Sequence, residues 1–77
     1  MNATTPHLVY MANQIATAFR TREPEAAVRA TFDHIWQFWD PRMRTLIVEH
    51  LAAGGDGLGD VAKGAVQLLA DRLQGAA

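Results

Sequence analysis

The sequence predicts a small all-α protein, a bundle of three to four helices. Apolar residues recur every three or four positions in four separate segments, and this spacing places them on one face of a helix. Each of the three prolines follows a polar residue, a common pattern at helix starts. No segment of useful length alternates apolar and polar residues as a β-strand does. The length of 77 residues fits a single helical domain over 1–77.

Two helices are expected in the first half of the chain. Thr5 and Pro6 predict the N-cap and the first residue of a helix over about 6–20. The residues expected on its core face are Leu8, Met11, Ala12, Ile15 and Phe19. Pro24 follows a polar break and starts a second predicted helix over about 24–38. The residues expected to face inward there are Val28, Phe32, Ile35 and Trp39.

Two more helices are expected in the second half. Asp40 and Pro41 repeat the N-cap and proline pattern and predict a helix over about 41–53. Its expected inward residues are Met43, Leu46, Ile47, His50 and Leu51. Gly54 and Gly55 predict its end, because glycine readily adopts the left-handed backbone that follows many helices.

The fourth predicted helix covers about 60–74, after a glycine-rich connector. The residues expected on its apolar side are Val61, Ala65, Leu68, Leu69 and Leu73. Gly64 lies inside it and costs about 1 kcal/mol of helix stability relative to alanine. The small residues of the tail 75–77 are expected to fray.

The composition argues against several classes of function. The net charge is −1 and Lys63 is the single lysine, so the clustered positive charge of nucleic-acid-binding proteins is missing. No apolar stretch approaches the roughly 20 residues of a membrane span. The absence of cysteine and of a secretory pattern predicts a cytoplasmic location. A domain this small has a thin core, which favours stabilisation by a partner.

We expect no catalytic, cofactor-binding or metal site in this chain. His7, His34 and His50 lie on three different predicted helices and lack the spacing of zinc ligands. No nucleophile, base and orienting group can be placed together from their spacing. The glycine-rich stretch 54–60 lacks the Gly-Lys-Ser/Thr ending of a phosphate loop, so it is expected to be a flexible connector.

The first predicted helix has an uncharged outer face. No Asp, Glu, Lys or Arg occurs in residues 1–19, and Tyr10, Asn13, Gln14 and Thr17 lie opposite the core face. Solvated helices usually carry charge there, whereas interface cores are poor in charge and rich in tyrosine. Tyr10, Asn13 and Gln14 are therefore candidate partner-binding residues. The alternative is a neutral face in contact with water.

Two aromatic residues and two arginines are further candidates for partner binding. Trp36 and Phe38 flank the inward face of the second predicted helix, so each either packs at the edge of the core or anchors a partner. Arg42 and Arg44 lie in or just after the first turn of the third helix, where the helix dipole disfavours cations. Either one of them pairs with a carboxylate of this chain, such as Asp40, or both contact acidic groups or carbonyls of a partner.

Two segments are distinctive as strings of residues: Met11–Ala16 in the first predicted helix and His34–Arg44 around Pro41. The most specific part is Phe-Trp-Asp-Pro-Arg-Met-Arg over residues 38–44. These segments resemble the delta subunit of NAD-dependent, molybdenum-containing formate dehydrogenase. The resemblance covers about residues 8–55, and the fourth helix matches only as an apolar segment after a glycine-rich loop.

The resemblance implies a cytoplasmic enzyme complex in which this chain is a small, non-catalytic accessory subunit. In such enzymes a large alpha subunit binds the molybdenum cofactor bis-molybdopterin guanine dinucleotide and iron–sulfur clusters, and it oxidises formate to carbon dioxide. Beta and gamma subunits pass the electrons through iron–sulfur clusters and FMN to NAD. The delta subunit is associated with assembly or stability of the active enzyme. The residues expected to contact the alpha subunit are Tyr10, Asn13, Gln14, Trp36, Phe38, Arg42 and Arg44.

Two other functions remain open from the sequence. A transient maturation chaperone would handle the apo-enzyme and then leave it. A small helical nucleic-acid-binding regulator is the other, and only Arg42 and Arg44 favour it, so we expect no nucleic-acid partner. We also expect no membrane partner, since the sequence has no long apolar stretch. Exposed aromatic residues could also make the isolated chain associate with itself.

Overall fold

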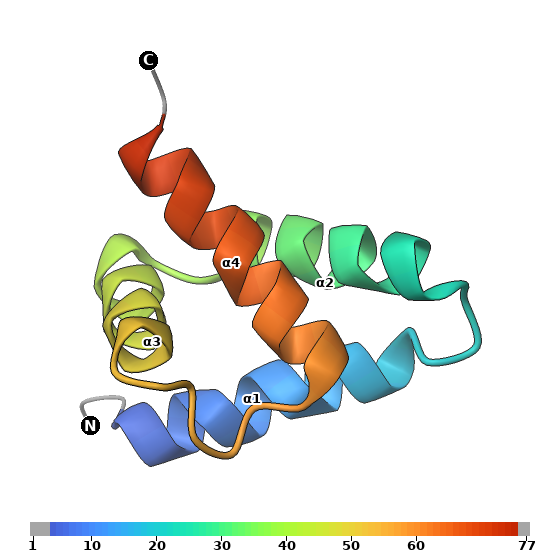
Figure 1. Cartoon of the computed structure of the whole chain (residues 1–77), viewed down its shortest axis with the longest axis horizontal. Coiled ribbons are helices and arrows are strands. Elements are labelled where there is room, and N and C mark those ends of the chain that lie inside the picture. Colours follow the sequence, from blue (N-terminus) through green and yellow to red (C-terminus); the bar gives the residue numbers. More distant parts are fainter. Residues whose placement is uncertain (1–3, 76–77) are drawn as a thin grey trace.

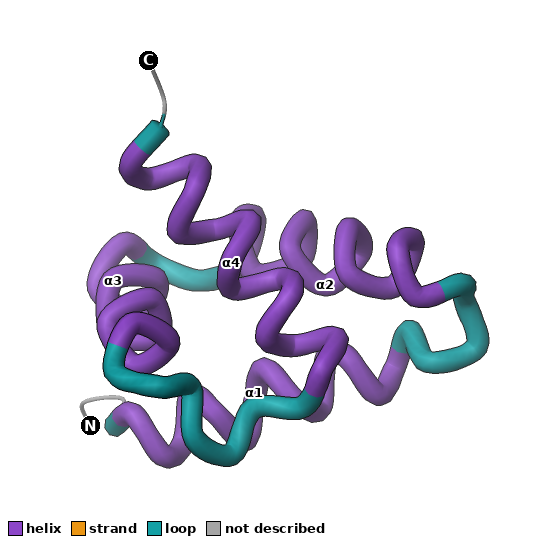
Figure 2. Tube along the Cα trace, viewed as in Figure 1, coloured by secondary structure: helices purple, strands orange, loops and turns teal. Residues whose placement is uncertain are grey.

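The computed structural model describes residues 4–75, and these form four α-helices joined by three connections, the longest between the last two helices (Figures 1 and 2). The helices are α1 (Thr5–Ala18), α2 (Pro24–Phe38), α3 (Pro41–Ala52) and α4 (Asp60–Gln74). Residues 4–75 contain no β-strand, which confirms the all-α prediction. α1 ends at Ala18, two residues before its predicted end, and α3 ends at Ala52, one residue before its predicted end. The predicted fraying of 75–77 concerns residues 76 and 77 mainly, and these lie outside the described part of the chain.

The helices form a compact bundle in which α4 lies across the other three. Figure 1 shows α1 and α2 running in opposite directions, with α3 at one end of the pair and α4 crossing them diagonally. α4 packs most extensively on α2, and it also contacts α1 and α3. Figure 2 shows the long connection between α3 and α4 passing beside α1. This connection brings the glycine-rich stretch against the first helix.

Side-chain caps start two of the helices. The Asp40 carboxylate accepts a hydrogen bond from the backbone N–H of Met43 at 2.9 Å, which confirms Asp40 as the N-cap of α3. The N-cap of α1 is Thr4, and the prediction of Thr5 was wrong by one residue. Pro6 therefore occupies the second helical position. Proline is compatible with that position because the backbone N–H groups of the first turn have no partner inside the helix.

The pair Gly54 and Gly55 ends α3 as predicted. Both have positive φ, at 123° and 67°, a conformation that side-chain-bearing residues rarely adopt. The N–H of Gly54 bonds to the carbonyl of Leu51, and that of Gly55 bonds to the carbonyl of His50. These two bonds satisfy carbonyl groups that the end of the helix would otherwise leave open.

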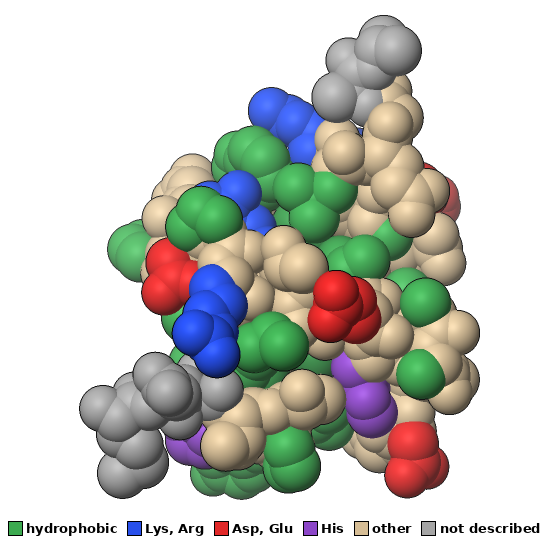
Figure 3. Space-filling view, turned by 90° about the vertical axis from the view of Figure 1, so that its left-hand side faces the viewer, with side chains coloured by type: hydrophobic (Ala, Val, Ile, Leu, Met, Phe, Trp, Pro, Cys, Tyr) green, Lys and Arg blue, Asp and Glu red, His purple; other side chains and the backbone are tan. Residues whose placement is uncertain are grey.

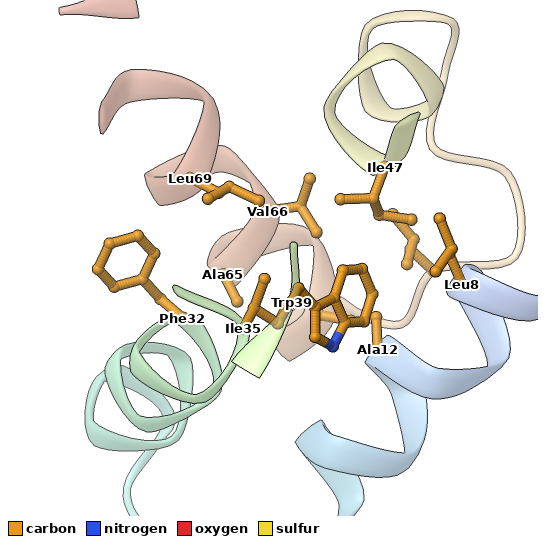
Figure 4. Packing of buried hydrophobic residues seen from close by; sticks show 11 residues of the cluster. Leu8, Ala12, Phe32, Ile35, Trp39, Ile47, Ala65, Val66 and Leu69 are labelled. Atoms are coloured by element: carbon orange, nitrogen blue, oxygen red, sulfur yellow. The ribbon is translucent and has the colours of Figure 1, made fainter. Parts of the chain in front are cut away.

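All four helices contribute to one hydrophobic core. Figure 4 shows side chains from α1, α2, α3 and α4 meeting between the helices, with the Trp39 indole at the end of α2 among them. The buried members are Leu8, Ala12, Phe32, Ile35, Trp39, Ile47, Leu58, Ala62, Ala65, Val66 and Leu69. Several residues predicted to face inward are only partly buried, namely Met11, Ile15, Phe19, Val28, Met43, Leu46, His50, Leu51, Val61 and Leu68. In a bundle this small, many side chains lie at the edge of the core.

The buried face of α4 differs from the predicted one. It consists of Ala62, Ala65, Val66, Leu69 and Ala70, whereas Leu73 is 43% exposed. Small side chains on this face let α4 approach α2 closely. Gly64 takes part in the same contact, since a Cβ added there would lie only 3.0 Å from a methyl carbon of Val28. The helix-breaking residue inside α4 therefore has a packing role.

We expect Asp40→Ala to lower the free energy of unfolding by about 1 kcal/mol, because it removes the cap of α3. For a domain of this size, that loss corresponds to a fall of about 4–8 °C in melting temperature. Thermal unfolding followed by circular dichroism measures it. Asp40→Asn is the matched control, since asparagine keeps the acceptor oxygen and should retain most of the stability. Equal losses in the two variants would contradict the capping role.

Candidate functional site

The ionisable side chains offer no evident centre for chemistry. Among residues 4–75, no three His, Cys, Asp or Glu side chains come close enough together to hold a metal ion. His50 is half-buried, and its Nε2 lies 2.7 Å from the carbonyl oxygen of Asp56. Because a carbonyl oxygen can only accept, Nε2 carries the proton and donates it in this bond. His50, which was expected to face inward, is therefore only partly buried and bonds to the connector after α3.

A largely apolar groove lies between α1, the end of α2 and the start of α3, and we call it the junction groove. Its volume is about 330 Å³. The side chains that line it are Tyr10, Met11, Gln14, Ile15, His34, Phe38, Trp39 and Met43. None of them is an Asp, Glu, Lys or Arg. A surface depression with this lining suits an apolar segment of another polypeptide.

Two aromatic side chains at the junction groove are open to solvent. Tyr10 is 60% exposed and Phe38 is 69% exposed, while the neighbouring Trp39 is only 4% exposed. The Phe38 ring lies 4.7 Å from the His34 ring, centroid to centroid, so its main neighbour is a side chain of its own helix. Large aromatic residues dominate binding hot spots, and soluble monomers rarely expose them together. The structure thus places Tyr10, Gln14 and Phe38, three of the predicted contact residues, beside one groove.

Trp36 has a different environment from Phe38. It is half-buried, and the guanidinium carbons of Arg44 and Arg72 each lie 4.4 Å from the centroid of its ring. Arg44 also donates a hydrogen bond from Nε to the carbonyl oxygen of Trp39 at 3.1 Å. From the sequence, a pairing of Arg44 with a carboxylate of this chain remained open. In the structure Arg44 instead contacts the Trp36 ring and the Trp39 carbonyl. Arg42, the other predicted arginine, is exposed to solvent.

Asn13 makes a structural contact with the glycine-rich connector. Its Nδ2 donates to the carbonyl oxygen of Gly57, and its Oδ1 accepts from the backbone N–H of Gly59, each at 2.9 Å. Both polar ends of the amide are therefore used within the chain, across more than forty residues of sequence. The predicted role of Asn13 in partner binding stays a prediction, and these two bonds use one donor and one acceptor site of its amide.

Several residues of these sites were not among the predicted contact residues. Arg72 lies on α4, whose orientation depends on tertiary packing, so its position near Trp36 could not be foreseen from spacing. Met11, Ile15 and Trp39 were expected in the core, and His34 was given no contact role, yet all four line the junction groove. Met43 was predicted inward and also lines this groove. For Met43, the signal in the sequence was its position between Arg42 and Arg44.

Comparisons with known proteins give one match. The model of a family described as "NADH-dependant formate dehydrogenase delta subunit FdsD" matches residues 7–66, well over half of the chain. The matched span includes the junction groove, Asn13, Trp36 and Arg44 and stops before Arg72. No curated protein and no solved structure matches the chain. Among residues 4–75, no helix has the length and apolar character required to span a membrane.

We expect Asn13→Ala to lower the free energy of unfolding by about 1–2 kcal/mol, because it removes two hydrogen bonds that hold the connector on α1. Urea unfolding measures the loss. Gln14→Ala, which changes the exposed neighbour, should alter stability by less than about 0.5 kcal/mol. Asn13→Asp adds a further test, since a carboxylate cannot donate to the Gly57 carbonyl and should not restore full stability.

Adjacent aromatic residues should respond very differently to truncation. Trp39→Ala removes a core side chain and should cost about 3–5 kcal/mol, enough to unfold much of the protein. Phe38→Ala removes an exposed ring and should change stability by about 0.5 kcal/mol or less. Urea unfolding of the two variants under the same conditions tests this contrast. A large loss for Phe38→Ala would show that Phe38 belongs to the core.

Proposed function

This chain belongs to the FdsD family, the delta subunits of NADH-dependent formate dehydrogenase, and from this premise we propose that it binds the large alpha subunit as a non-catalytic accessory subunit. In this role it supports the assembly or the stability of the active enzyme. The proposal names a partner and a purpose that go beyond family membership. It rests on the surface of the molecule, where a groove and exposed aromatic side chains offer a contact area.

The single observation that carries the proposal is the open junction groove with Tyr10 and Phe38 exposed beside it. A partner that covers exposed aromatic side chains removes them from water. This removal is a main source of binding free energy. Phe38 starts the string over residues 38–44 that resembles delta subunits most closely. The residues that carry the resemblance and those that line the groove are therefore partly the same.

The residues of this chain do not suit the redox groups of the enzyme. The sequence contains no cysteine, and iron–sulfur clusters are held mainly by cysteine thiolates. We therefore place the molybdenum cofactor, the iron–sulfur clusters, FMN and NAD in the partner subunits. This chain contributes binding free energy alone.

Binding of this kind stabilises a partner through mass action. A chain that binds the folded, cofactor-loaded alpha subunit better than its open form raises the population of the loaded form. At a free concentration 100 times its dissociation constant, the gain would be about 2.7 kcal/mol. Such a gain is comparable to a large fraction of the stability of many domains.

Co-purification tests the proposal. Tagged chain expressed with the formate dehydrogenase subunits should retain the alpha subunit. The double variant Tyr10→Ser/Phe38→Ser should retain at least about tenfold less alpha subunit than wild type does. Leu73→Ala is the matched control, because Leu73 is an exposed apolar residue of α4 outside the junction groove. Circular dichroism of each variant shows whether the fold is intact.

Three results would argue against the proposal or change it. Retention of the alpha subunit by the double variant at the wild-type level would remove the junction groove from the interface. Normal formate oxidation and normal molybdenum content in cells that lack the chain would contradict the assembly role. One copy per alpha subunit in purified active enzyme indicates a permanent subunit, whereas none indicates a transient chaperone.

A further inference from the structure

We propose that Trp36, Arg44 and Arg72 form a carboxylate-binding site, the arginine clamp, which takes an Asp or Glu side chain of the partner polypeptide. This site lies on α2, α3 and α4 and involves a helix that the sequence analysis left without a role. The inference rests on the proposed function, because the acidic residue is expected on a formate dehydrogenase subunit. It is separate from the junction groove, whose lining does not include Trp36, Arg44 or Arg72.

The geometry brings two guanidinium groups to one ring. Their central carbons each lie 4.4 Å from the centroid of the Trp36 ring, so they cannot be farther apart than twice that distance. Arg44 reaches the ring from the start of α3 and Arg72 from the last turn of α4. Two positive charges at this separation repel each other, and the indole face offsets the repulsion only in part.

The hydrogen bond of Arg44 leaves its outer donors free for a ligand. Arg44 donates through Nε to the Trp39 carbonyl at 3.1 Å, which fixes the plane and position of its guanidinium. A guanidinium has five N–H donors, and four of them are on the terminal nitrogens. A carboxylate can accept two of these in parallel, a geometry that arginine favours and lysine does not match.

The charges around the clamp favour an anion. Within residues 4–75, the partners of the two guanidinium groups are an aromatic ring and a carbonyl oxygen, and no carboxylate pairs with them. Arg42, two residues before Arg44, is exposed and adds a further positive charge to the start of α3. The acidic neighbours in sequence have other partners: one Asp40 oxygen caps α3 through the Met43 N–H, and Asp71 Oδ1 accepts from Gln67 Nε2.

The surface chemistry of the chain also suits a protein partner. Figure 3 shows the face on the α3 side, where Lys and Arg side chains lie next to hydrophobic ones. Interfaces commonly combine aromatic residues and arginine in this way. Nucleic acid is the less suitable occupant, since the chain has net charge −1 and one lysine.

Binding of full-length chain to the formate dehydrogenase alpha subunit tests the clamp. We expect Arg72→Gln and Arg44→Gln each to weaken binding by about tenfold and to flatten its dependence on salt. Arg22→Gln is the matched control, because Arg22 is also an exposed arginine over an aromatic ring, with its guanidinium carbon 5.0 Å from the Phe19 centroid. It should bind within about twofold of wild type. Wild-type binding by the Arg72→Gln variant would overturn the clamp and leave the proposed function in place.

A second measurement does not depend on the enzyme. Hexaglutamate added to the isolated chain should change the tryptophan fluorescence of wild type and of Arg22→Gln, and the change should be absent in Arg72→Gln. An equal response in Arg72→Gln, a similar response to hexalysine, or tighter binding of a single-stranded oligonucleotide would each overturn the carboxylate site. Response to hexaglutamate with no binding to the alpha subunit would instead contradict the proposed function alone.

Discussion

The burial of Trp39 at the corner between α2 and α3 is the constraint on which the rest of the structure depends. Its side chain is 4% exposed and packs in the common core, while its carbonyl receives the Nε hydrogen bond of Arg44. The next residue, Asp40, caps α3. The buried Trp39 ring, the hydrogen bond from Arg44 Nε to the Trp39 carbonyl and the Asp40 cap thus fix the angle between α2 and α3. The junction groove includes Phe38, Trp39 and Met43 from this corner, and the arginine clamp includes Trp36 and Arg44.

This arrangement separates the aromatic residues by function. Trp39 stabilises the fold, Phe38 remains open at the junction groove, and the Trp36 ring lies 4.4 Å from the guanidinium carbons of Arg44 and Arg72. Three aromatic residues in a run of four positions therefore have three different environments. A helix turns by about 100° per residue, so neighbours in sequence necessarily face different directions. Family membership identifies the enzyme to which the chain is related. The environments of the three rings indicate which surfaces of the chain are available to a partner.

Local signals made the helices predictable, because proline, capping residues and glycine act over a few residues. Asp40 and Gly54 mark helix boundaries in the structure where the sequence suggested them. Thr4 and Thr5 have similar capping chemistry, and the choice between them depends on backbone angles that composition does not reveal. The buried face of α4 was harder to predict, since it is rich in alanine and Gly64 allows the close approach of α2. The same applies to the two hydrogen bonds of Asn13 and to Arg72, which depend on contacts between distant segments.

The central claim is that the junction groove is covered by the alpha subunit in the assembled enzyme. Site-specific photo-crosslinking tests it most directly, with benzoylphenylalanine placed at position 38 and, for comparison, at the exposed position 67 on α4. Irradiation of the purified complex should join position 38 to a peptide of the alpha subunit, with far less product from position 67. Crosslinks from position 67 but none from position 38 would contradict the claim.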